Sequence, residues 1–223
     1  MTILAFGCSV THGADLVHPN QHEDNVKYSY PNLIANTLGV PCLNYAQCGM
    51  SNEGIFHKFL NTMRTWQSDD VTAVIVCWTS TMREYWRADD RDWYIISSWC
   101  ATSKNNRPLK YFKDYTDADI NINPRVCADE SFYMEPLSQM YNLITRYKFD
   151  HMEYLKKKLN YVEQVKLYCN MYNLKLIETC CIDFVPGIDL NLDNFGHWRQ
   201  GLGHPTRQDH EQIAQHILLS YER

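Results

Sequence analysis

One serine, one glycine and one histidine, far apart in the chain, have the chemistry of an acyl-transfer site. Gly7-Cys8-Ser9 follows a short apolar run, Gly49 lies in a polar turn, and His204 stands before a proline. A serine hydroxyl attacks a carbonyl carbon when a base takes its proton and N–H groups stabilise the resulting oxyanion. Ser9 can supply the hydroxyl, His204 the base, and the backbone N–H groups of Ser9 and Gly49 two of the donors.

The elements that must position these residues are strands alternating with helices. Apolar runs predict buried strands at 3–6, 40–45, 71–78 and 174–180. Helical spacing predicts helices from about 30 to 38, from 52 to 63, over 137–147, over 151–172 and from 206 to 221. This order predicts an α/β fold, a three-layer α/β/α sandwich with a mainly parallel sheet. The carboxyl ends of its strands meet at one edge, where ligands bind.

Two stretches fall outside this alternation. Residues 182–202 are rich in Asp, Asn and Gly and are interpreted as a loop. Residues 82–136 are rich in Tyr and Trp and are interpreted as an insertion of loops and short helices within one domain, 1–223. The rings of the insertion can bind a sugar or an acyl chain, or can form a small core under long loops.

Four blocks, in order along the whole chain, resemble the SGNH hydrolases, also called the GDSL-type esterases and lipases. That family has Gly-Asp-Ser after its first strand, an oxyanion glycine within Asn-x-Ala-x-x-Gly-x-Ser, a third block after the third strand, and a His-Pro pair with a second His six residues on. The residues that match here are Gly7 and Ser9; Asn44, Ala46, Gly49 and Ser51; and His204, Pro205 and His210. The resemblance implies a carboxylic ester hydrolase with an acyl-enzyme intermediate, without metal or organic cofactor.

The chain departs from the family pattern in two places that affect catalysis. The third block is normally Gly-x-Asn-Asp, and Ser80 stands in place of the oxyanion Asn, with Thr79 as the alternative. The family usually has Asp three residues before the catalytic histidine, where this chain has Gly201. Asp193 is the first candidate for the missing acid and Asp189 the second. A Ser–His dyad oriented by a backbone carbonyl is the other alternative.

Other polar residues have more modest predicted roles. His12 is expected to line the pocket, and Arg83 to contact substrate or to form an ion pair. His18 and His22 lie in a polar loop without regular ligand spacing, so no metal site is predicted. The basic run 156–158 is expected to be a solvated helix face.

Composition limits the classes of partner. A formal net charge of −5 disfavours nucleic acid and anionic membranes as partners. No apolar run approaches the ~20 residues that span a bilayer. Nine cysteines, an odd number, are expected to be reduced. Without a charged leader, the chain is predicted to be cytoplasmic.

The sequence therefore predicts a serine esterase for a small acyl ester or a carbohydrate-linked ester. The alternative is an SGNH-fold binding or structural module that has lost turnover and recognises a carbohydrate or a partner protein. The substitutions at Ser80 and Gly201 motivate that alternative. The oligomeric state is not predicted.

Overall fold

The computed structural model describes most of both ends of the chain and short parts of its middle. The described residues are 1–18, 22–81, 84–87, 92–96, 109–112, 124–125, 151–181, 185–188, 190–195 and 204–221. The helix expected over 137–147 lies outside these residues.

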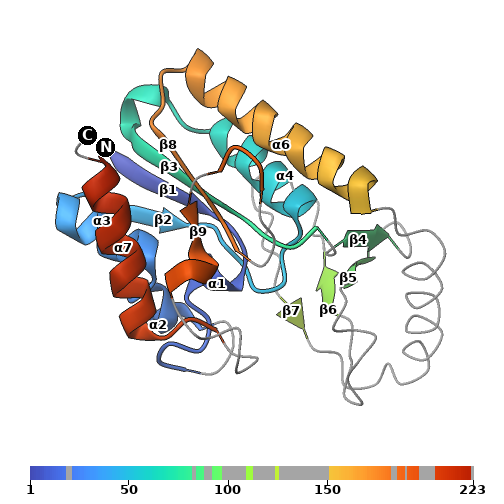
Figure 1. Cartoon of the computed structure of the whole chain (residues 1–223), viewed down its shortest axis with the longest axis horizontal. Coiled ribbons are helices and arrows are strands. Elements are labelled where there is room, and N and C mark those ends of the chain that lie inside the picture. The colour runs from blue at the N-terminus through green and yellow to red at the C-terminus, as the bar shows by residue number, and fades with distance from the viewer. Residues whose placement is uncertain are drawn as a thin grey trace.

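The main sheet has five parallel strands in the order β2-β1-β3-β8-β9 (Figure 1). They are β1 (Thr2–Phe6), β2 (Cys42–Asn44), β3 (Val71–Trp78), β8 (Leu176–Cys180) and β9 (Leu190–Asn191). Four of them confirm the predicted strands. The fifth, β9, consists of two residues within the stretch interpreted as a loop. Two residues are too few to show an alternation of apolar and polar side chains.

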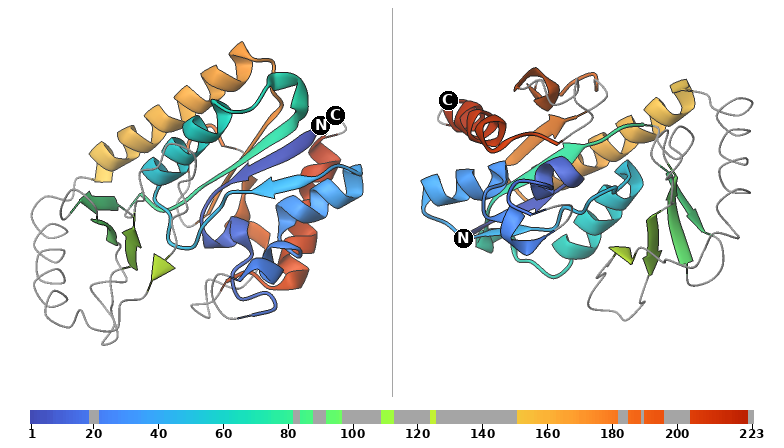
Figure 2. Two further views of the ribbon diagram at one scale, coloured as in Figure 1. Left: turned by 180° about the vertical axis from the view of Figure 1, so that it is seen from behind. Right: turned by 90° about the horizontal axis from the view of Figure 1, so that it is seen from below.

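Helices cover both faces of this sheet, so the predicted three-layer sandwich is confirmed (Figures 1 and 2). One face carries α3 (Tyr30–Leu38) and α7 (Arg207–Tyr221), which pack on each other. The other carries α4 (Asn52–Met63) and α6 (His151–Met171), which also pack together. The short helices are α1 (Ser9–His12), α2 (Glu23–Val26) and the 3-10 helices η1 (Ser68–Asp70) and η3 (Leu192–Phe195).

The central strands divide the core into two halves. Leu4 and Phe6 of β1 pack towards α4 and α6, whereas Ile3 and Ala5 pack towards α3 and α7. All four are fully buried. Burial on both faces of a parallel strand explains why the sequence reads as one continuous apolar run there. The same packing fixes where the carboxyl end of β1 lies.

Local signals set the helix ends as the sequence predicts. Gly39 ends α3 with a φ of 67°, a left-handed conformation that favours glycine. At the start of α7, the Asp209 N–H donates to Thr206 Oγ1 (3.3 Å) and the Thr206 N–H donates to Asp209 Oδ2 (2.7 Å). This is the predicted capping box.

A second, four-stranded antiparallel sheet lies within the insertion, in the order β4-β5-β6-β7. Its strands are β4 (Glu84–Arg87), β5 (Asp92–Ile96), β6 (Leu109–Phe112) and β7 (Pro124–Arg125). Figures 1 and 2 show it near the first turn of α6. The expectation of loops and short helices was wrong for these residues, because aromatic and β-branched side chains favour a pleated surface.

Two further expectations can be compared with the structure. The described cysteines 8, 42, 48, 77, 169, 180 and 181 are reduced, as predicted. Within the part of the chain that the structure describes, no helix is both long and apolar enough to cross a membrane.

Candidate active site

Ser9 begins the short helix α1, three residues after the last residue of β1, Phe6. Gly7 makes this turn possible, because a Cβ at that position would lie 2.2 Å from Thr11 Oγ1. The Ser9 carbonyl accepts the N–H groups of Gly13 and Ala14, each at 3.0 Å. Ser9 is 4% exposed. Its side chain is therefore held at the carboxyl end of β1.

His204 is paired with an acid that the sequence did not reveal. Nδ1 of His204 lies 2.6 Å from Oδ2 of Asp15. Asp15 directly follows the turn that closes α1, and its φ of 65° turns the chain there. A carboxylate only accepts hydrogen bonds, so Nδ1 carries the proton and the Nε2 lone pair is left to act as a base. Among the described residues, no hydrogen bond joins Ser9 Oγ to the His204 ring. In enzymes without bound substrate, the hydrogen bond between nucleophile and base is often long and tightens only when substrate binds.

The structure describes no side-chain position for either of the two acids proposed from the sequence. Asp193 belongs to η3, but its side chain lies outside the described part, and Asp189 lies outside it altogether. Arg83 and Gly201 are also outside. Asp15 lies six residues after Ser9, and nothing in the sequence near it marks it as the partner of His204.

The turn containing Gly49 lies next to the turn that carries Ser9. The Gln47 N–H donates to the Gly7 carbonyl at 3.2 Å, and the Met50 N–H closes the turn onto the Gln47 carbonyl at 3.3 Å. Gly49 has a φ of 81°, as a type II turn requires at its third residue. The second block is thus hydrogen-bonded to the first.

Asn44, the first residue of that second block, links three segments. Its Nδ2 donates to the Thr11 carbonyl at 2.8 Å and to Ser29 Oγ at 3.2 Å. Its Oδ1 accepts the Ala46 N–H at 3.0 Å. The motif asparagine therefore positions α1 relative to the end of β2 and does not itself supply an oxyanion donor.

Thr79 and Ser80 are held in place by Asn52, which sequence reasoning used only as a helix cap. Asn52 Oδ1 accepts the Thr79 N–H at 2.8 Å, and Nδ2 donates to the carbonyls of Thr79 (3.1 Å) and Ser80 (3.2 Å). Thr79 is fully buried and Ser80 is 7% exposed. The start of α4 thus fixes the third block.

Lys158 also contacts this segment, so the prediction of a solvated basic face was wrong for this residue. Its Nζ donates to the Thr79 carbonyl at 2.5 Å, and the residue is 1% exposed. Lys158 lies four residues before Val162 and seven before Val165, both fully buried. That helical spacing was the signal that could have placed it on the inner face.

Five buried side-chain polar atoms lack a hydrogen-bond partner among the described residues, and three of them follow three different strands of the sheet. These three are Nδ1 of His12 after β1, Oε1 of Gln47 after β2 and Oγ1 of Thr79 after β3. Burial lowers the pKa of His12 to about 4, so its ring is neutral at pH 7. An unpaired buried polar group costs about 1–3 kcal/mol. A polar ligand at this edge of the sheet would remove that cost.

His210, the second histidine of the last block, has a structural role. Its Nδ1 accepts the Tyr30 N–H at 3.1 Å, and the two rings stack with centroids 5.9 Å apart. Burial lowers the pKa of His210 to about 4. The ring thereby connects α7, which follows His204 in the chain, to the start of α3.

Comparisons with known proteins give no family match and a weak likeness in fold. No protein-family model and no curated protein matches the chain. A solved structure of the lipolytic G-D-S-L family from Desulfitobacterium hafniense DCB-2 is similar with a TM-score of 0.47 and 8% identity over 97% of each chain. Another member, from Veillonella parvula DSM 2008, has a TM-score of 0.39 and 14% identity over 100% of this chain and 99% of its own.

A family two carbohydrate esterase from Clostridium thermocellum is also similar, with a TM-score of 0.38 and 13% identity. The match covers 98% of this chain and 62% of that one. At these scores no activity or residue role carries over. The fold of this chain, a three-layer sandwich with a parallel five-stranded sheet, stands on its own strand order and layers.

Proposed function

We propose that this chain is a serine ester hydrolase of the SGNH type that forms an acyl-enzyme on Ser9. The observation that carries the proposal is the 2.6 Å pair between His204 Nδ1 and Asp15 Oδ2. It supplies a histidine with an oriented base nitrogen, and Asp15 itself follows the short helix that begins at Ser9. Nucleophile, base and acid are the three parts that serine acyl transfer needs.

In the proposed reaction, Ser9 Oγ attacks the ester carbonyl carbon and its proton passes to Nε2 of His204. Asp15 stabilises the imidazolium that forms. The tetrahedral intermediate collapses as the imidazolium gives its proton to the departing alcohol, leaving the acyl group on Ser9. A water molecule, deprotonated by the same nitrogen, then releases the carboxylic acid and restores the serine.

The oxyanion is assigned to three donors at the same edge of the sheet. They are the backbone N–H of Ser9, the backbone N–H of Gly49 and the hydroxyl of Ser80, with Thr79 as the alternative to Ser80. Support comes from the hydrogen bond that ties the Gly49 turn to Gly7 and from the three bonds by which Asn52 fixes residues 79 and 80. Preorganised donors of this kind are worth about 10²–10³-fold in kcat each.

Asp15 is our first choice for the acid, and Asp193 is its rival. Asp15 is favoured because its contact with His204 is direct and short. The Asp193 side chain has no described position to set against it. A dyad without an acid is the remaining alternative, and mutation of the two aspartates separates all three.

For the substrate we propose a small acyl ester, with a carbohydrate-linked ester favoured. The aromatic content of residues 82–136 offers flat surfaces to a sugar ring. The unpaired atoms of His12 and Gln47 suit a polar alcohol group better than a long acyl chain. His12 and Gln47 lie in the segments that follow β1 and β2.

The test is hydrolysis of p-nitrophenyl acetate, p-nitrophenyl butyrate and a panel of acetylated sugars by the wild type and by Ser9→Ala. Ser220→Ala, at an exposed serine on α7, is the matched control. We expect turnover by the wild type and the control and none by Ser9→Ala. A folded wild type that hydrolyses none of these esters would contradict the proposal and favour the binding module.

A further inference from the structure

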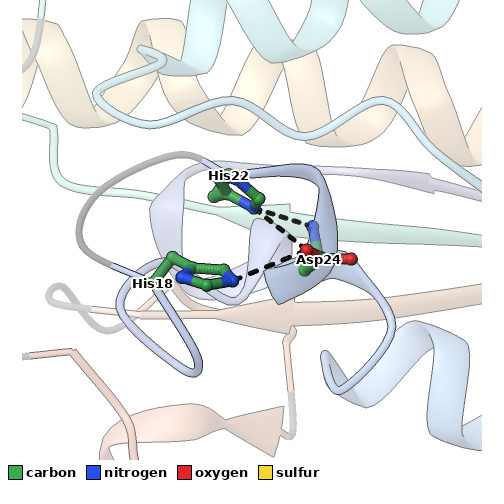
Figure 3. Close-up of side chains that lie close together, drawn as sticks. All are labelled: His18, His22 and Asp24. Atoms are coloured by element: carbon green, nitrogen blue, oxygen red, sulfur yellow. Dashed lines mark hydrogen bonds and ion pairs between the residues drawn. The ribbon is translucent and has the colours of Figure 1, made fainter.

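Two histidines and an aspartate, none of them a proposed catalytic residue, converge where the loop after α1 enters α2. His18 Nε2 lies 3.5 Å from Asp24 Oδ2, and His22 Nδ1 lies 3.6 Å from the same oxygen (Figure 3). The ligand atoms of all three residues lie within 4.8 Å of one another. The sequence spacing gave no warning of this, because the turn into α2 is what brings the Asp24 carboxylate beside both rings, whose centroids lie 4.2 Å apart.

We propose that His18, His22 and Asp24 bind Zn²⁺, with water completing the coordination. Tetrahedral zinc holds its ligands at about 2.0–2.1 Å, which sets neighbouring ligand atoms about 3.4 Å apart. Two edges of this cluster, 3.5 and 3.6 Å, are close to that value. The two histidine nitrogens lie within 4.8 Å of each other, so a modest rotation of one ring brings all three atoms onto one ion.

The backbone of His18 is held in place by a buried side chain. Asn25 is fully buried; its Oδ1 accepts the N–H groups of Val17 (2.8 Å) and His18 (2.9 Å), and its Nδ2 donates to the His18 carbonyl (2.8 Å). The loop is thus folded back onto α2 before any ion arrives. A site whose ligands are preorganised loses less entropy when it binds.

Lys27 orients the Asp24 carboxylate and also repels a bound cation. Its Nζ lies 2.6 Å from Asp24 Oδ1, which leaves Oδ2 as the single oxygen facing the two rings. Such outer contacts orient a ligand. The ammonium charge reduces the attraction for a cation. An ion must also take the His22 Nδ1 lone pair from the Asp24 N–H, a bond of 3.2 Å.

The ligand chemistry selects zinc over the hard divalent cations. Mg²⁺ and Ca²⁺ prefer six or more oxygen ligands, whereas two imidazoles and one carboxylate suit zinc. The site lies apart from the proposed catalytic residues, and no chemical step is assigned to the ion. Because its ligands lie on or next to the loop that begins at Asp15, the bound ion would stabilise the conformation of that loop.

The proposal is tested by titrating ZnCl₂ into the untagged, metal-stripped full chain in a calorimeter. We expect saturable binding that His18→Ala, His22→Ala and Asp24→Asn each weaken by at least about 10-fold. His57→Ala is the matched control, because His57 is an equally exposed histidine paired with a carboxylate, Glu53, on α4 (3.7 Å). The control variant should bind as the wild type does.

Co²⁺ supplies a second readout that does not involve an ester. Tetrahedral Co²⁺ absorbs visible light strongly, so the wild type should develop this band and the three ligand variants should not. Circular dichroism checks that the variants are folded. Absence of saturable Zn²⁺ binding, ligand variants that bind as the wild type does, or a weak octahedral Co²⁺ spectrum would overturn the proposal, whatever the esterase assay shows.

Discussion

Asp15 and His204 are separated by 189 positions in the chain, yet their side chains meet at 2.6 Å. Asp15 follows the short helix of Ser9, and His204 precedes α7, so the contact ties the two ends of the chain across one edge of the sheet. The partner of the histidine thus comes from the segment that also carries the proposed nucleophile. The proposed mechanism therefore needs no acid next to His204 in the sequence.

Asp15→Asn is expected to lower kcat sharply with little change in KM or in folding. The amide keeps the size of the side chain, but it neither fixes the imidazole tautomer nor stabilises the imidazolium. In a serine protease the corresponding change costs about 10⁴-fold. Steady-state kinetics on p-nitrophenyl acetate measure the loss, and Asp193→Asn is the comparison. If only Asp193→Asn had a lowered kcat, Asp193 and not Asp15 would be the acid that orients His204.

Gly49→Ala is expected to reduce kcat by at least about 10-fold, because shifting the turn moves a donor away from the oxyanion. Gly39→Ala is the matched control. Both glycines have positive φ, 81° and 67°, so both variants pay a strain of about 1–2 kcal/mol. Only Gly49 belongs to the proposed site. Equal kcat values for the two variants, at similar losses in urea stability, would remove Gly49 from the oxyanion hole.

Asn52→Asp is expected to destabilise the fold by about 2 kcal/mol or more. The carboxylate can still accept the Thr79 N–H, but it cannot donate to the carbonyls of Thr79 and Ser80 and would face them with a negative charge. Asn36→Asp, at an exposed position on α3, controls for the added charge. Urea unfolding monitored by Trp fluorescence compares the two. Equal midpoints would show that Asn52 does not secure the third block.

Stability should fall as pH drops from 6.5 towards 4, in part because of His210. The folded pKa of His210 is about 4, against 6.5 for an ordinary histidine, because burial disfavours its charged form. The unfolded chain therefore binds the extra proton within this window. The stabilisation is complete above pH 6.5 and is lost as pH falls to 4, up to about 3 kcal/mol.

His210→Asn tests that assignment, since an amide oxygen can accept the Tyr30 N–H without titrating. Its free energy of unfolding should depend less on pH between 5 and 6.5 than that of the wild type. Ser220→Ala, at an exposed residue that does not titrate in this range, should leave the wild-type slope unchanged. Parallel slopes for His210→Asn and the wild type would mean that His210 is not buried in its neutral form.

The main elements of the fold were predictable because their signals are local. The apolar runs of β1 and β3 mark strands buried on both faces, and Gly39 and the Thr206–Asp209 box mark helix ends. The nucleophile turn was readable for the same reason. Gly7 and Ser9 are adjacent to a strong strand, and the structure adds the steric reason for the glycine.

Contacts between distant segments were not predictable. Nothing near Asp15 in the sequence points to His204, and nothing near Lys158 points to the Thr79 carbonyl. The first contact depends on how two loops meet after folding, and the second on how a helix meets the end of a strand. The strands of the second sheet were missed for a different reason, because frequent Asp, Arg and Asn interrupt their alternation.

The most direct test of the proposed function is the site of covalent labelling by a fluorophosphonate. This reagent forms a stable adduct with an activated serine, independently of the natural ester. We predict one adduct, located by peptide mass spectrometry on Ser9, which is absent in Ser9→Ala and strongly slowed in Asp15→Asn. An adduct on another residue, or undiminished labelling of Ser9→Ala, would contradict the assignment of Ser9 as the nucleophile.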